Sequence, residues 1–239
     1  EYYGSNQSFQ SSNQVFYVAL LLPFAFLLKK QKSKYAFLIL GLIASLISFK
    51  RSVLIYTSLV FLVAIYFDYL KLRKKGLIKN VLIGCILLSC SFLAYDYVNK
   101  LTGEHISGRF EKTAEDKGGG RLDIYEVTWN KYINQPLVYK LFGIGFNGVY
   151  GKQWVFFMHG DYASAHNDFL EILCDFGVIG IVIYLIFVIM IIRRIQYSRL
   201  INNKYYQANI AALIIFFVMS MVSHLVIYPN YFAYLVIIW

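Results

Sequence analysis

Apolar residues run along this chain in long blocks, which short clusters of charged residues separate. Windows of about 19 residues define six such blocks. They cover residues 14–28, 35–49, 52–70, 77–95, 169–192 and 208–228. Because a bilayer core of about 30 Å takes about 20 apolar residues of helix, the pattern predicts a bundle of transmembrane helices. Pro23 predicts a bend in the first of them.

One long polar segment divides the sequence into three parts. We expect about four transmembrane helices in residues 1–95, an extracytoplasmic loop over 96–167, and further transmembrane helices in 168–239. The final apolar run, 231–239, is too short to span a bilayer. Since the chain starts at Glu1 and ends inside that run, we interpret it as a piece of a longer protein.

The composition supports a membrane protein. Hydrophobic residues make up 59% of the 239 residues, charged residues only 15%, and the mean hydropathy is +0.55. Soluble domains hold about 45–50% apolar residues, so the predicted fold class is an all-α integral membrane protein, a polytopic helix bundle. A net charge of +10 would suggest a nucleic-acid partner in a soluble protein. The basic residues fall in every second loop instead, so we expect no nucleic acid.

The basic loops predict the orientation, because Lys and Arg accumulate on the cytoplasmic side of transmembrane helices. We therefore place three loops in the cytoplasm: 29–34, 71–79 and 193–204. The intervening segments then lie outside: 1–13, the turn at Lys50-Arg51, 96–167 and 228–230. Basic and acidic residues nearly balance in the longest of these, so it carries no cytoplasmic signal.

The long outer segment contains a candidate amphipathic helix over residues 122–134. Its apolar and aromatic residues recur at helical spacing. They are Leu122, Tyr125, Trp129, Tyr132 and Ile133. We expect this helix to lie against the membrane surface or the bundle and to stop before Pro136.

Two arginines lie on the outer side, where the charge rule for orientation does not explain them. Arg51 stands in a turn between two spans and either binds an anion or extends to lipid head groups. Arg121 follows three glycines, 118–120, whose backbone N–H groups suit an anion. The alternative for Arg121 is a solvated residue of a flexible loop.

His166 precedes the apolar block that begins at Phe169, at the expected N-terminus of a helix that Asn167 or Asp168 caps. Imidazole accepts a proton from a hydroxyl near neutral pH, although a lone interfacial histidine is also an ordinary polar group. Glu171, about one turn away, is predicted to orient or charge-balance this site. Asp175 is expected to be paired within the bundle, and Gly177 and Gly180 to allow close helix packing.

Other patterns carry no chemistry. The G-x-G-x-x-G sequence over 143–148 lacks a βαβ context, so we read it as a turn. His159 and His224 show no metal-ligand spacing, and we predict neither a metal nor a cofactor. The cysteines have no paired spacing and are expected to be buried thiols. They are Cys85, Cys90 and Cys174.

In order along the chain, these features resemble the bacterial O-antigen ligase and Wzy-type polysaccharide polymerase family. The matching stretches are Ser12-Asn13-Gln14, Lys50-Arg51-Ser52, Gly119-Gly120-Arg121-Leu122-Asp123-Ile124-Tyr125 with Trp129, Pro136 with 141–145, and Ala165-His166-Asn167-Asp168-Phe169-Leu170 with 177–180. One departure is Lys50-Arg51, where the family pattern has Ser-Arg.

The resemblance implies an inverting, metal-independent glycosyltransferase of the bacterial cytoplasmic membrane, with its active site on the outer face. Arg51 and Arg121 would bind the pyrophosphate of an undecaprenyl-linked glycan donor, with Lys50, Glu171 and Trp129 as further substrate-binding residues. His166 would activate a hydroxyl of the acceptor, either a lipid-linked repeat unit or a lipid core.

Two other classes remain open from the sequence. A transporter or flippase of lipid-linked glycans would also hold phosphate with outer arginines, but would be expected to show repeat symmetry and a polar path. A non-catalytic membrane subunit would use the outer loop for partner binding. Ligation and polymerisation share one chemistry and differ in the acceptor.

Overall fold

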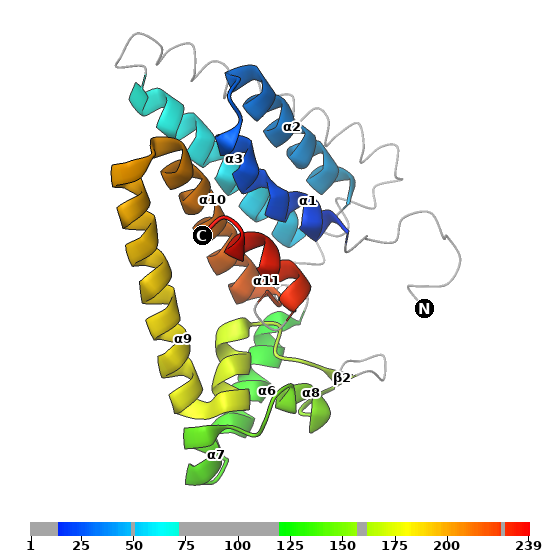
Figure 1. Cartoon of the computed structure of the whole chain (residues 1–239). Helices are drawn as coiled ribbons and strands as arrows, with labels where there is room; N and C mark the ends of the chain where they lie inside the picture. The colour runs from blue at the N-terminus through cyan, green and yellow to red at the C-terminus, as the bar shows by residue number, and fades with distance from the viewer. Residues whose placement is uncertain (1–13, 49–50, 72–119, 157–161, 226–227) are drawn as a thin grey trace, which may run out of the picture.

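The structure is a computed structural model that describes residues 14–48, 51–71, 120–156, 162–225 and 228–239 (Figure 1). Its elements in chain order are α1 (Val15–Leu21), the 3-10 helix η1 (Leu22–Leu27), α2 (Gln31–Ile47), α3 (Arg51–Lys71), α6 (Arg121–Ile133), α7 (Leu137–Phe142), α8 (Gly148–Gly151), β1 (Val155–Phe156), β2 (Tyr162–Ala163), α9 (Asp168–Ile201), α10 (Asn203–Val222) and α11 (Pro229–Val236). The fold is helical, as predicted, apart from the pair of two-residue strands, which are antiparallel.

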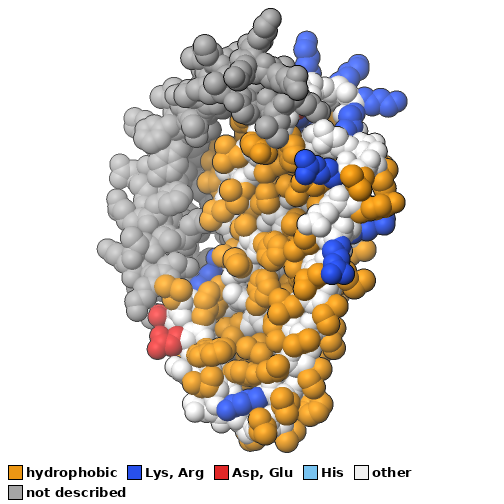
Figure 2. Space-filling model, turned by 90° about the vertical axis from the view of Figure 1, so that its left-hand side faces the viewer, with side chains coloured by type: hydrophobic (Ala, Val, Ile, Leu, Met, Phe, Trp, Pro, Cys, Tyr) orange, Lys and Arg blue, Asp and Glu red, His pale blue; other side chains and the backbone are white. Residues whose placement is uncertain are grey.

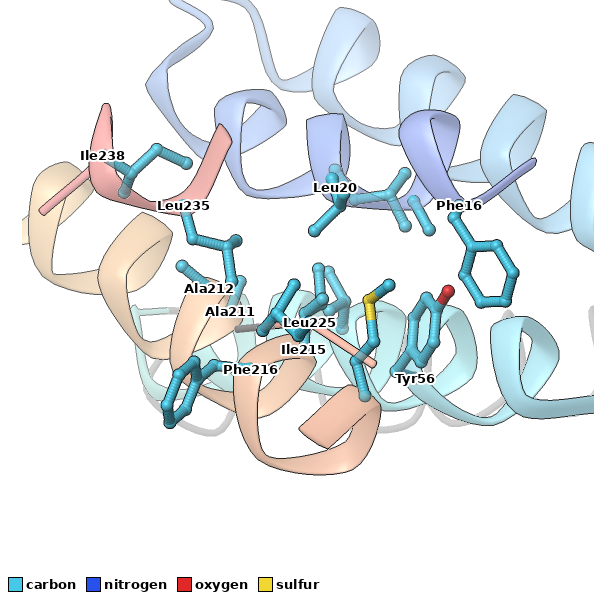
Figure 3. Packing of buried hydrophobic residues seen from close by; sticks show 14 of the residues in the cluster. Phe16, Leu20, Tyr56, Ala211, Ala212, Ile215, Phe216, Leu225, Leu235 and Ile238 are labelled. Carbon is cyan, nitrogen blue, oxygen red and sulfur yellow. The ribbon is translucent and has the colours of Figure 1, made fainter. Parts of the chain in front are cut away.

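The helices α1, η1, α2, α3, α9, α10 and α11 form the larger of two units. Helix α10 is at its centre and packs against α3, α9 and η1. Its small residues Ala208, Ala211 and Ala212 are fully buried, which lets the neighbouring backbones approach closely. Between them and α1, α3 and α11 lies an apolar core, seen in Figure 3 with Leu20, Tyr56, Phe216 and other side chains.

Two helices in the described part are long and apolar enough to cross a membrane, α9 with 34 residues and α10 with 20. Two shorter apolar helical segments cover Val15–Leu27 and Ser52–Asp68. Hydrophobic side chains cover most of the described surface in Figure 2, and most Lys and Arg side chains there gather at its upper end. The expected span at 77–95 lies outside the described residues, as do Cys85 and Cys90.

The predicted span over 169–192 lies within α9, which has a break that the sequence did not predict. Helix α9 breaks at Gly177, whose φ of 68° and ψ of −165° are not helical. In Figure 1 the start of α9 and its longer remainder run in clearly different directions. The break frees backbone carbonyls of the first part, and N–H groups of the preceding loop bind them: Ile144 N to Cys174 O and Gly145 N to Asp175 O, at 2.9 and 3.0 Å.

Several predicted boundaries also need correction. The loop expected over 193–204 is mostly helix, because α9 continues to Ile201 and α10 begins at Asn203, leaving Asn202 to cap it through its side chain. The span expected over 208–228 ends early, at Val222. Lys34, expected in a charged loop, lies inside α2 and is buried against Asp68. Where a bend was predicted at Pro23, the α-helix α1 gives way to the 3-10 helix η1.

A smaller unit packs on the first part of α9. It comprises α6, α7, α8 and the strand pair, with a second apolar cluster of Ile124, Tyr132, Val149, Trp154, Val155, Ala163 and Cys174. The helix expected over 122–134 is present as α6, and it ends before Pro136.

The buried face of α6 differs from the predicted stripe. It runs through Ile124, Thr128 and Tyr132, whereas Leu122 and Trp129 are exposed. Thr128 can be buried because its hydroxyl donates to the Ile124 carbonyl at 2.7 Å, which satisfies its polar atom within the helix.

Candidate active site

Two chain segments meet beside α6, one before α9 and one after α10. Asn167 caps α9 by accepting from Leu170 N at 3.0 Å, as predicted, and its amide nitrogen lies 3.3 Å from Met221 O. The buried Asp168 carboxylate accepts from Leu225 N at 2.9 Å. The end of α10 is thereby joined to the start of α9 through hydrogen bonds of the two residues that follow His166.

Helix α6 is attached to the same junction through Tyr125. Its hydroxyl donates to Met221 O at 2.8 Å and lies 3.2 Å from the carbonyl oxygen of His166. Burial raises the pKa of Tyr125, while the nearby Arg121 charge and the Asn167 side chain lower it in part. Tyr125 therefore acts as a neutral hydrogen-bond donor that holds α6 against the two segments.

His166 lies at the centre of this junction, partly buried and with a left-handed backbone, φ 51°. The preceding residue is held in turn, because Ala165 N donates to the buried Glu171 carboxylate at 2.6 Å. Burial lowers the pKa of His166, and the positive charge of Arg121 lowers it further. Near neutral pH its imidazole is therefore uncharged and able to accept a proton.

Arg121 is the first residue of α6 and follows Gly120, whose φ of 72° is in the positive range that glycine permits. Its guanidinium is close enough to lower the pKa of His166, of Tyr125 and of a second histidine, His224. Arg121 also lies one turn before Tyr125, whose hydroxyl is 3.2 Å from the His166 carbonyl oxygen, so the structure places Arg121 and His166 in the same junction, 45 positions apart in sequence. Gly118 and Gly119 lie outside the described residues.

The other predicted site residues are placed differently. Arg51 is the first residue of α3, but its side chain, like the whole of Lys50, lies outside what the structure describes. Trp129 is exposed on α6, its ring 5.9 Å from that of Tyr132. The Glu171 carboxylate accepts from Ala165 N, in the turn that carries His166.

Asp175 is paired, although with backbone of the smaller unit. Its carboxylate accepts from Asn147 N at 2.6 Å and from Gly148 N at 2.9 Å. These N–H groups belong to the 143–148 segment, which is a turn, as predicted. Cys174 is buried, also as predicted.

Sequence reasoning missed His224 and its neighbour Ser164. The expected span over 208–228 put His224 inside the membrane, whereas α10 ends at Val222 and His224 follows the helix. Its ring lies 4.7 Å from the His166 ring, and its Nε2 lies 2.6 Å from Ser164 Oγ. The polar pair Ser223-His224, which interrupts an apolar run, was the available signal.

The arrangement contains an uncharged imidazole, a guanidinium and buried carboxylates at one end of a helix bundle. In the described ranges, no group of three His, Cys, Asp or Glu side chains is arranged to hold a metal ion. The apolar helices define a helical integral membrane protein. The polar junction is a candidate site that combines a proton acceptor with a positive charge suited to an anion.

Comparison with known proteins defines the family. The family model for O-antigen ligase matches residues 9–185, which is more than half of the chain, and the protein therefore belongs to the O-antigen ligase family. A search of curated proteins found no match. The resemblance stated from the sequence is confirmed.

Proposed function

We propose that this protein is a membrane glycosyltransferase that transfers or polymerises glycan from an undecaprenyl-pyrophosphate donor onto an acceptor hydroxyl. The observation that carries the proposal is that Tyr125 joins the first turn of α6, which begins at Arg121, to the His166 carbonyl in a member of the O-antigen ligase family. His166 supplies a base and Arg121 a fixed positive charge, and glycosyl transfer from a diphosphate uses both.

The proposed reaction is an inverting displacement at the anomeric carbon. His166 takes the proton of the acceptor hydroxyl as its oxygen forms the new glycosidic bond. The bond between the anomeric carbon and the pyrophosphate oxygen breaks, and undecaprenyl pyrophosphate leaves with the electron pair. Arg121 stabilises the charge on the leaving group, because a planar guanidinium pairs with phosphate oxygens in a bidentate manner. In this scheme guanidinium charge takes the part that a metal ion plays in other transferases.

The other predicted residues have supporting roles in this scheme. Arg51, with Lys50 before it, adds positive charge for the pyrophosphate. Glu171 fixes the turn that carries His166, through Ala165 N. Trp129 is exposed one turn beyond Tyr125, which suits a ring that stacks on a sugar face.

The substrates fix the cellular location that we propose. A polyprenyl-linked donor is confined to the bilayer, so the site lies on the outer face of the bacterial cytoplasmic membrane. Its acceptor is a lipid-linked repeat unit in polymerisation and a lipid core in ligation. The basic residues at the opposite end of the bundle agree with that orientation.

Transfer assays with the protein in liposomes test the proposal. His166→Ala is expected to lower the rate by about 100-fold or more. Arg121→Ala is expected to lower it by about 100-fold, because the leaving group loses its charged partner. Lys131→Ala is the matched control: it removes a positive charge from the exposed face of the same helix and should leave the rate unchanged.

The same variants in cells distinguish the other classes. Loss of long or attached glycan, with protein still in the membrane and lipid-linked precursor accumulating outside, supports the transferase. Unchanged glycan in both variants would contradict it and favour a non-catalytic subunit. Precursor trapped on the cytoplasmic side would favour a transporter.

A further inference from the structure

His224 is a buried histidine that the proposed reaction does not use. It is only 5% exposed and lies two residues beyond the end of α10. Its Nε2 shares a 2.6 Å hydrogen bond with Ser164 Oγ, and its Nδ1 is buried with no hydrogen-bond partner among the described residues. A buried imidazole with one unpaired nitrogen lowers the stability of the fold. We therefore ask what His224 does beside His166.

The position of the His224 ring is fixed from several sides. Tyr125 binds the Met221 carbonyl just before it, and Asp168 binds the Leu225 N–H just after it. Tyr228 contacts the ring at a centroid distance of 5.6 Å. The plane that His224 presents to His166 is therefore set by contacts with α6, with α9 and with the segment before α11.

The two imidazole rings lie against each other at a tilt. Their centroids are 4.7 Å apart, with an angle of 34° between the rings. His166 is partly exposed, whereas the His224 ring that lies against it is buried.

We propose that His224 is a positioning residue for His166: held by Ser164, its ring covers one face of the His166 imidazole, excludes water there and keeps that imidazole in its uncharged form. The proposal rests on the proposed function for the use made of His166, but the arrangement of the rings is testable without activity.

The charged and titratable groups around His166 are consistent with this role. Arg121 and Tyr125 face it from α6, and Asp168 and Glu171 begin α9; the two carboxylates bind Leu225 N and Ala165 N. Burial, followed by the effects of His166 and Arg121, lowers the pKa of His224 to about 4. At neutral pH His224 is therefore uncharged and acts on His166 by excluding water, while Arg121 acts by its charge.

The test is the protonation of His166, measured by its reaction with diethyl pyrocarbonate, because imidazole reacts with this reagent only in its uncharged form. The pH midpoint of modification is read from the peptide that contains His166, by mass spectrometry, on the purified protein. His224→Ala admits water and should raise the midpoint by about half a pH unit or more. His224→Phe refills the space and should keep the midpoint near that of the unchanged protein.

Equal midpoints for His224→Ala and the unchanged protein would overturn the proposal, and so would an equal rise in both variants. If His224→Ala does not accumulate, Ser164→Ala supplies a second measurement: it releases the ring without deleting it and should raise the midpoint too. An unaltered midpoint in Ser164→Ala would then count against the proposal. Glycan transfer that persists in the His166→Ala variant would, in contrast, contradict the proposed function. It would not affect the result of the modification measurement.

Discussion

The backbone of His166 is held in a conformation that only its neighbours can enforce. A φ of 51° is uncommon for a residue other than glycine and costs about 1 kcal/mol or more. Hydrogen bonds on both sides offset this cost: Ala165 N to Glu171, and Leu170 N to the Asn167 cap. The site therefore places one imidazole by means of carboxylate and amide groups that bind the backbone on either side of it.

At the same scale, the charge of Arg121 sets a testable pH dependence. His166 accepts a proton only when uncharged, so activity falls as the pH drops through its pKa. Arg121→Gln removes a positive charge and so raises the pKa of His166. In a plot of kcat/KM against pH, the fall in activity on the acidic side should then occur about half a pH unit higher. Arg121→Lys retains the charge and is the matched control. Acidic limbs at the same pH in both variants would contradict this electrostatic coupling.

Among the elements, the break in α9 determines where the smaller unit sits. Gly143 and Gly177 allow the backbones to meet: a Cβ at Gly143 would lie 2.1 Å from Asp175 O, and one at Gly177 would lie 2.3 Å from Leu141 O. Both glycines have positive φ. The sequence suggested close packing at Gly177, but its pairing with Gly143 depends on a contact between two distant segments.

This contact predicts a sharp difference between two glycine variants. Gly177→Ala combines a positive φ with a clash against backbone and should lower the free energy of unfolding by about 1–3 kcal/mol or more. Gly151→Ala, in α8 of the same unit, meets no atom within 4 Å and should change stability little. Thermal unfolding in detergent measures both. A Gly177→Ala protein as stable as Gly151→Ala would refute the role of the break.

Across the whole molecule, an ion pair fixes the end opposite the candidate site. Lys34 and Asp68, each 5% exposed, join α2 to α3 with nitrogen and oxygen 2.5 Å apart. Gln31 and the Tyr35 hydroxyl also donate to Asp68. Lys204, at the start of α10, donates to the Leu28 carbonyl nearby. The basic residues at this end thus hold helices together as well as predicting orientation.

Breaking this pair should destabilise the bundle far more than removing a surface lysine. Lys34→Met leaves a buried carboxylate without its cation, which costs about 3–5 kcal/mol. Adding Asp68→Leu should recover most of the loss, because the orphaned charge is then gone. Lys32→Met, on the exposed side of α2, is the control. Thermal unfolding of the four proteins checks this, and a double variant no more stable than Lys34→Met would count against it.

The sequence by itself determined the class of protein and most of its helices. Hydropathy, helical spacing and capping residues are local properties, so they predicted α6 and a cap by Asn167 or Asp168, and the sequence marked Arg121 and His166 as candidates. They could not define the buried face of α6, because Thr128 counts as polar in the sequence. Its hydroxyl is buried because it donates to the Ile124 carbonyl within the helix.

Only the tertiary structure decided which polar groups meet. Tyr125 binds Met221 across 96 positions, and Ser164 binds His224 across 60. Such pairings depend on how helices pack, because a histidine after an apolar run has the same sequence pattern whether it faces lipid, solvent or a second imidazole. The partner of His166 and the break at Gly177 follow from long-range contacts that no local pattern encodes.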